Sequence, residues 1–265
     1  MLTRTFRSQR VEIRYYISHP PGDSAGCIVF THGFCADHSI FDLQLNSFTD
    51  RYDVVTWDIP LHGASRPYEN YSTEAAAGEL LGILDAEELT GPAVLVGHSV
   101  GTFIHRVFAA MHPERVRGIV EISGLLPAGG RRSFRLNVLS RSSRIIASMP
   151  FRRYRRIFAG RTCITDRSRI RIKASLIRLG RGGTTAAARC CLDPLPALPA
   201  PAAPDCPVLS VIGESERLPL YGRSSRSDGT VVLPRAGHYP TCDAPAAFNR
   251  ELDGFIGRLP KMPPQ

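Results

Sequence analysis

Short apolar runs alternate with segments of helical periodicity along the first half of the chain. Residues 11–17 (VEIRYYI) alternate apolar and polar positions at period two, which predicts an early strand. Largely apolar runs predict buried strands, and amphipathic stretches predict helices between them. The expected strands lie at 27–33, 53–58, 93–97 and 117–124, and the expected helices at 41–52, 72–89 and 101–116. This alternation implies an α/β fold, in which a parallel sheet carries helices on both faces.

The pattern breaks after Gly124. Residues 125 to about 192 are rich in arginine and show mixed periodicity with few strand signals. Residues 192–205 (LDPLPALPAPAAPD) contain five prolines, form neither a helix nor a central strand, and are expected to be a return linker. Core patterns then resume, with two strands and a closing helix expected at 206–214, 230–234 and 243–259. We therefore expect a core made of two stretches and one inserted segment between them: 1–124 and 205–265 for the core, and 125–204 for the inserted segment.

Positive charge is concentrated in one part of the chain. The net charge is +9, yet residues 131–181 carry fifteen arginines, one lysine and a single acid, Asp166. That stretch has a charge of +15, and the rest of the chain, with 17 basic and 23 acidic residues, has a charge of −6. The densest stretch is FRRYRRIF (151–158). On a helix its arginines and its aromatic residues would occupy different faces.

A serine stands between two glycines at the end of an apolar run, in VLVGHSVGTF (94–103). The pattern G-x-S-x-G indicates a sharp strand-to-helix turn that holds the serine in a strained conformation, with its hydroxyl above a sheet. Glycines at 97 and 101 would leave room where the strand and helix backbones crowd together. The pattern predicts that Ser99 is a nucleophile, provided that other motifs supply a base, an acid and hydrogen-bond donors.

Further motifs accompany the serine, and their order along the chain is THGFCADHSIF (31–41), WDIPLHGASRP (57–67), GHSVG (97–101), VIGESER (211–217) and GHYPTCDAP (237–245). Together they resemble the α/β-hydrolase family, in the form that has a helical cap inserted after the sixth strand. The resemblance covers roughly 9–124 and 205–258. It implies the α/β-hydrolase fold, a mostly parallel, doubly wound sheet, with the inserted, mainly helical cap at 125–204. WDIPLHGASRP departs from the family's D-x-P-G-H-G-x-S turn at Leu61 and is expected only to shape a loop.

The resemblance implies a base and an acid for Ser99. Among eight histidines, only His238 lies late in the chain after a short strand and a glycine, where the family has its base. Imidazole takes up a proton near neutral pH, which activates a serine hydroxyl. Glu216 occupies the position where the family usually has an aspartate, and glutamate is accepted in such triads. Glu214 is a competing acid, and the stretch from Glu216 to His238 is shorter than usual for the family.

The family also supplies two main-chain N–H groups that bind a developing oxyanion. By resemblance these belong to Phe34, after His-Gly, and to Val100, after the nucleophile. Cys35 and His38 lie close by in sequence and are further candidates for substrate contact. A packed thiol is the simpler interpretation of Cys35, because no base accompanies it in sequence.

The arginine-rich segment offers the remaining candidate residues. Arg152, Arg155 and Arg156 would share one helix face, and arginine pairs well with carboxylates and phosphates. We therefore expect them to contact an anionic substrate, although a solvated cap surface explains the same charges. An acidic carrier protein and an anionic membrane surface are alternative partners. A nucleic acid is not expected, because a basic patch on a lid over a hydrolase pocket suits a small anion better.

Composition excludes several classes of protein. The seven cysteines show no C-x-x-C spacing, which argues against a disulfide framework and a zinc site, and we expect neither a metal nor a cofactor. No run reaches the roughly 18 consecutive apolar residues of a membrane span. The first residues, MLTRTFRSQRVEIRYY, lack the apolar region of a secretory signal, so a cytoplasmic location is expected.

The motifs favour a serine-dependent hydrolase, similar to esterases and thioesterases, that acts by acyl transfer. Its expected substrate is an ester, thioester or lactone of small to medium size, with anionic and carrier-bound acyl groups among the candidates. One alternative is a biosynthetic enzyme of the same fold, such as a C–C hydrolase, a lyase or a cyclase, since one fold hosts many reactions. The other is a ligand receptor without catalytic activity that retains the triad.

Overall fold

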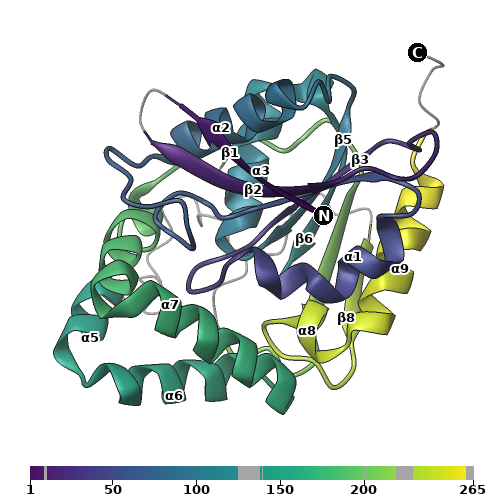
Figure 1. Cartoon of the computed structure of the whole chain (residues 1–265). Helices are drawn as coiled ribbons and strands as arrows, with labels where there is room; N and C mark the ends of the chain where they lie inside the picture. Colours follow the sequence, from purple (N-terminus) through teal and green to yellow (C-terminus); the bar gives the residue numbers. More distant parts are fainter. Residues whose placement is uncertain (9–10, 125–137, 139, 200, 219–228, 261–265) are drawn as a thin grey trace.

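The computed structural model describes residues 1–8, 11–124, 138, 140–199, 201–218 and 229–260. Its centre is an eight-stranded sheet in the order β1-β2-β4-β3-β5-β6-β7-β8 (Figure 1). The strands are β1 (Leu2–Arg7), β2 (Glu12–Ser18), β3 (Cys27–Thr31), β4 (Asp53–Trp57), β5 (Ala93–His98), β6 (Val116–Ile122), β7 (Val208–Gly213) and β8 (Gly229–Leu233). The strands β3 to β8 run parallel, and β1 and β2 are the antiparallel members.

Helices cover both faces of this sheet. The helices around it are α1 (Asp42–Phe48), α2 (Thr73–Ala86), α3 (Val100–Met111), α8 (Pro240–Asp243) and α9 (Pro245–Arg258), with short 3₁₀ turns η1 (His38–Phe41) and η2 (Pro113–Arg115). Helix α2 packs against α3, and α1 packs against α9. The two pairs lie on opposite faces (Figure 1). The central strands β3 and β5 are wholly buried, which explains their continuous apolar sequences. The predicted α/β fold is confirmed.

One strand was missing from the prediction. Residues 2–7 form β1, which pairs with β2 at the edge of the sheet and is mostly exposed. Because neither face of this strand is fully buried, its sequence does not need alternating apolar residues, and Arg4 and Arg7 interrupt the pattern. The helix expected at 101–116 is also shorter than predicted. It ends at Met111, just before Pro113.

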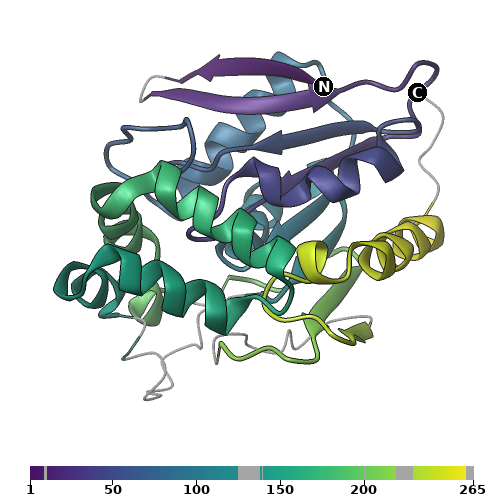
Figure 2. The same ribbon diagram turned by 60° about the horizontal axis from the view of Figure 1, so that its bottom comes forward.

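Among the described residues between β6 and β7, the structure has three helices. They are α5 (Ser142–Ser148), α6 (Phe151–Thr162) and α7 (Asp166–Cys191), and the proline-rich stretch after them contains one 3₁₀ turn, η3 (Leu195–Ala197). Figure 2 shows α6 and α7 side by side, with one end of α7 near α8. Parts of the predicted core and inserted segment lie outside the described residues: 9–10, 125–137, 139, 200, 219–228 and 261–265. We propose the division into core (1–124 and 205–265) and inserted segment (125–204) as the domain organisation.

The turn from β5 into α3 explains the two glycines of GHSVG. A Cβ atom on Gly101 would lie 2.4 Å from the carbonyl oxygen of Thr31, at the end of β3. A Cβ atom on Gly97 would lie 2.8 Å from the backbone of Gly101. Ser99, between them, has φ 52° and ψ −113°, a conformation that costs an L-residue about 1–3 kcal/mol. Both glycines therefore allow strand and helix to meet at a sharp corner.

The described part of the chain contains no helix with the length and apolar character needed to cross a bilayer.

We predict that Gly101→Ala lowers the free energy of unfolding by at least about 1–3 kcal/mol, because the added methyl group meets main-chain atoms that cannot move away locally. Gly78→Ala is the matched control. Gly78 lies on the exposed side of α2 with no atom near the added methyl, so this change should stabilise the protein by about 0.5–1 kcal/mol. Urea unfolding of the two variants measures both effects. Equal effects would show that the elbow does not require glycine at 101.

Candidate active site

Ser99 stands at the junction of β5 and α3, at the carboxyl ends of the parallel strands. Its N–H donates to the carbonyl of Ile122 at 2.9 Å, which ties the corner to the end of β6. The residue is 7% exposed. Since Ser99 precedes the first turn of α3, its side chain lies at the positive end of a helix dipole.

His238 lies beside this corner, in the loop between β8 and α8. Its carbonyl accepts a hydrogen bond from Nε2 of His98 at 2.8 Å, and the two rings are 4.7 Å apart. Burial holds the pKa of His98 well below its usual range, so this side chain is neutral and its single N–H is used in the bond. Because His98 directly precedes Ser99, the bond places the loop of His238 next to the predicted nucleophile.

Glu216 follows β7 and reaches the imidazole of His238. Nδ1 of His238 donates to Oε2 of Glu216 at 2.8 Å, and both side chains are almost fully buried. The N–H of Leu218 donates to Oε1 at 2.8 Å. Burial acts to raise the pKa of Glu216, but His238, the Leu218 N–H and the Ser123 hydroxyl together hold it below the usual value of a glutamate. The carboxylate is therefore ionised at neutral pH.

Glu214, the competing acid, points elsewhere. It is exposed, and its Oε2 accepts from the backbone N–H of Arg235 at 3.2 Å. Of the two glutamates that the sequence left open, the geometry brings only Glu216 to His238.

Two main-chain N–H groups flank Ser99. A Cβ atom on Gly33 would lie 2.8 Å from Cβ of Ser99, so the backbone leading into Phe34 passes directly beside the serine. Within the described residues, the N–H of Phe34 has no acceptor. Val100 begins α3, and the first N–H groups of a helix lack intrahelical acceptors. Phe34 and Val100 thus both lie close to Ser99, and we propose their N–H groups as the oxyanion donors.

An aromatic face of α6 covers the residues that follow β3. Phe158 packs edge-on against Phe34, with ring centroids 6.4 Å apart, and Tyr154 stacks on Phe158. The Tyr154 hydroxyl lies 3.7 Å from Sγ of Cys35. The sequence predicts that these aromatic rings share one helix face but does not assign them to the site. Their spacing at 151, 154 and 158 was the available signal.

Cys35 lies in the segment that follows β3, two residues after Gly33. It is fully buried, and its backbone has φ 65°. Burial raises the pKa of its thiol well above the usual range, so the sulfur is protonated and a poor nucleophile.

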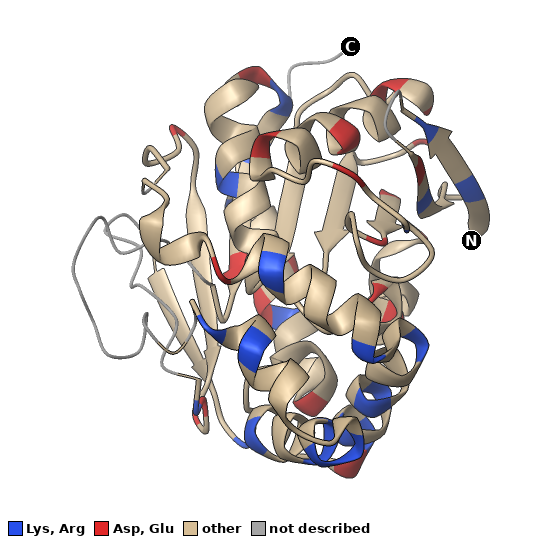
Figure 3. Cartoon of the chain, turned by 90° about the vertical axis from the view of Figure 1, so that its left-hand side faces the viewer, with Lys and Arg blue, Asp and Glu red and all other residues tan. Residues whose placement is uncertain are grey.

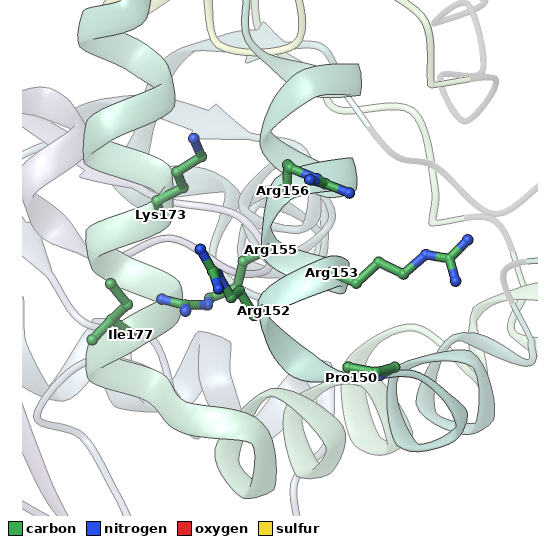
Figure 4. A pocket seen from close by; sticks show the side chains of 7 residues that line it. All are labelled: Pro150, Arg152, Arg153, Arg155, Arg156, Lys173 and Ile177. Atoms are coloured by element: carbon green, nitrogen blue, oxygen red, sulfur yellow. The ribbon is translucent and has the colours of Figure 1, made fainter.

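The structure does not bring the other predicted substrate contacts to Ser99. Nδ1 of His38 is bonded to Asp58 at 2.8 Å, and its ring stacks on Tyr16 of β2, with centroids 3.7 Å apart. A set of three predicted arginines lines a groove between α6 and α7 (Figure 4): Arg152, Arg155 and Arg156.

Asp243, at the end of α8, joins the loop of His238 to the inserted helices, and sequence reasoning missed it. Its carboxylate accepts hydrogen bonds from five groups, namely the N–H groups of Gly237, Ile164 and Thr165 and the hydroxyls of Thr165 and Ser168. In addition, the N–H of His238 donates to the carbonyl of Thr162 at 2.8 Å. The position of His238 therefore depends on the turn between α6 and α7.

Among the described residues, no cluster of three or more histidine, cysteine, aspartate or glutamate side chains is arranged to hold a metal ion.

Comparison with known proteins identifies the family to which this fold belongs. The model of the alpha/beta hydrolase family matches residues 28–251. The chain belongs to this family.

Individual relatives are more distant. A 2-(acetamidomethylene)succinate hydrolase of Mesorhizobium japonicum is 30% identical over 119 residues, which are 44% of this chain and 42% of that protein. The karrikin insensitive 2 receptor CA of Petunia hybrida is 31% identical over 107 residues, 38% of this chain and 39% of the receptor. The chain thus aligns with less than half the length of these curated relatives.

Solved structures are similar over nearly the whole chain. A thermophilic esterase from Thermogutta terrifontis, with malate bound, gives a TM-score of 0.78 at 20% identity and covers 97% of this chain and 99% of the esterase. An enol-lactonase from Burkholderia xenovorans gives a TM-score of 0.77 at 16% identity and covers 94% of this chain and 97% of the lactonase. At these identities the similarity shows the fold.

We predict that Asp243→Asn lowers the free energy of unfolding by about 1–3 kcal/mol, because an amide group would face N–H donors that now point at a carboxylate oxygen. Asp253→Asn is the control, since Asp253 is exposed and pairs with Arg51 at the surface. Loss of this surface ion pair should lower the free energy of unfolding by less than about 1 kcal/mol. Denaturant unfolding of both variants gives the comparison. Equally small losses would contradict the proposed link between α8 and α7.

Proposed function

We propose that the protein is a serine hydrolase that transfers the acyl group of an ester, thioester or lactone to water. The observation that carries this proposal is the buried hydrogen bond between His238 and Glu216 beside the Ser99 corner. Ser99 stands at a strained corner beside His238, and Nδ1 of His238 donates to Glu216 at 2.8 Å.

The geometry supports a stepwise acyl transfer. Glu216 keeps the proton of His238 on Nδ1, which leaves Nε2 free to accept the proton of the Ser99 hydroxyl. The Ser99 oxygen then attacks the substrate carbonyl, and the resulting oxyanion accepts hydrogen bonds from the N–H groups of Phe34 and Val100. His238 gives its proton to the leaving group. Water, deprotonated by His238, next attacks the acyl-serine, and the returning proton restores Ser99.

The surroundings of the site favour a substrate with an apolar acyl part. Phe34, Tyr154 and Phe158 form an aromatic wall near Ser99. The similar folds of an esterase and an enol-lactonase support an ester or lactone. Anionic and carrier-bound acyl groups remain within the proposal, because the inserted segment carries the excess positive charge of the chain. None of the seven cysteines forms a disulfide, which supports a reducing compartment such as the cytoplasm.

Ser99→Ala should abolish covalent labelling by a fluorophosphonate and lower kcat for a p-nitrophenyl ester by several orders of magnitude, since triad members act as a unit. Labelling should persist in Cys35→Ala. Mass spectrometry of the labelled peptide identifies the modified atom. A label on Cys35 or on another serine would refute the assignment, and labelling without ester turnover would favour a receptor or a different reaction of the same fold.

Glu216→Gln should lower kcat by a factor on the order of 10³–10⁴, because an amide does not stabilise the imidazolium that forms on His238. Glu214→Gln, two residues away and exposed, should leave kcat within about a factor of two, as expected for a surface change. Steady-state kinetics on folded variants, checked by circular dichroism, distinguish the two. Similar small losses in both would mean that the acid is another residue.

A further inference from the structure

A groove of about 580 Å³ runs between the outer sides of α6 and α7, away from the aromatic wall. Figure 4 shows the side chains that line it. Five are cationic and none is acidic, and the cations are Arg152, Arg153, Arg155, Arg156 and Lys173. Such a density of like charge is unfavourable unless an anion offsets it.

Other arginines of α7 have acidic partners. Arg171 pairs with Asp42 at 2.6 Å, and Arg178 pairs with Asp37 at 2.6 Å. In contrast, none of the five groove cations has an acidic group within 4.0 Å in the described part of the chain. Nε of Arg155 is also buried without a hydrogen-bond partner, while its guanidinium lies over the ring of Phe151. The groove thus offers unused positive charge and unused donors.

Large apolar side chains are exposed on the same two helices. Ile170 and Ile177 of α7 are 68% and 60% exposed, and Ile157 of α6 is 39% exposed. Ile170, Lys173 and Ile177 follow the i, i+3, i+7 spacing of one helix stripe. Figure 3 shows the basic residues gathered on the inserted helices. Cations mixed with exposed aliphatic side chains are typical of surfaces that lie on anionic bilayers.

We propose that the outer groove of α6 and α7 docks on an anionic phospholipid surface. Lipid phosphates would occupy the groove, and Ile157, Ile170 and Ile177 would reach the boundary of the acyl chains. A free phosphate would use the same cations but would gain nothing from the isoleucines. The docking does not depend on the reaction proposed for Ser99.

Binding to vesicles tests this directly, with the purified full chain and no activity assay. The chain should cosediment with an equal mixture of phosphatidylglycerol and phosphatidylcholine and not with phosphatidylcholine alone. Binding should weaken as salt rises from about 0.1 M to about 0.5 M. One cation near an anionic surface contributes roughly a fivefold gain in binding. The triple variant R152Q/R156Q/K173Q should therefore bind on the order of a hundredfold more weakly.

The control variant R7Q/R250Q/R258Q removes the same charge from exposed positions outside the groove. Its vesicle binding should weaken by less than about a tenth of the factor expected for R152Q/R156Q/K173Q. Ile170→Ser with Ile177→Ser should weaken vesicle binding at unchanged charge. Thermal unfolding establishes that each variant is folded. Equal losses in the two triple variants, or equal binding to both kinds of vesicle, would overturn the proposal.

Two other outcomes would also overturn it. If glycerol phosphate displaced the chain completely and the isoleucine changes had no effect, the groove would be a site for a free phosphate. If vesicles failed to bind and polyglutamate did bind, the groove would recognise an acidic protein.

Discussion

The backbone of Ser99 is held in a conformation that L-amino acids rarely adopt, and the neighbouring backbone packs closely enough to keep it there. Gly101 lies against the carbonyl of Thr31, and Gly97 lies against Gly101. The N–H of Ser99 is bonded to Ile122, so three adjacent strands, β3, β5 and β6, meet at one corner. A strain of about 1–3 kcal/mol persists only because these contacts over-determine the turn. The same corner fixes the positions of two further residues. His98 is hydrogen-bonded to the carbonyl of His238, and Gly33, which precedes Phe34, lies against Ser99.

The base of the site depends equally on the inserted helices. His238 is bonded through its backbone to Thr162, and Asp243 binds both Gly237 and the first turn of α7. Movement of α6 and α7 would therefore change the position of His238 as well as the packing on Phe34 and Cys35. In this arrangement the inserted helices contribute to the geometry of the predicted catalytic residues.

The sequence predicted those parts of the molecule that depend on adjacent residues. GHSVG specifies a local turn, and its glycines, its serine and the following helix all lie within one short stretch. Glu216 and His238 could be predicted because each lies a few residues after a strand, and the structure brings their side chains within 2.8 Å of each other. The edge strand β1 was missed because an exposed strand needs no apolar alternation. Asp243 was missed because its five donors come from residues 164–168 and 237, and only the folded chain brings these together.

Helix α6 shows why residue type alone could not predict which side of the helix, and therefore which arginines, would face the substrate. The helix separates Tyr154, which is buried, from Arg152 and Arg156, which are exposed, whereas Arg155 is half-buried with its guanidinium over Phe151. Burial decides which face of α6 packs on Phe34 and Cys35. Tyr154 and Phe158 lose unfavourable contact with water when they pack on Phe34 and Cys35, whereas guanidinium groups in that position would need buried counter-charges. The aromatic face therefore turns inward, and the cations are left on the outer surface, where the described residues give them no acidic partner.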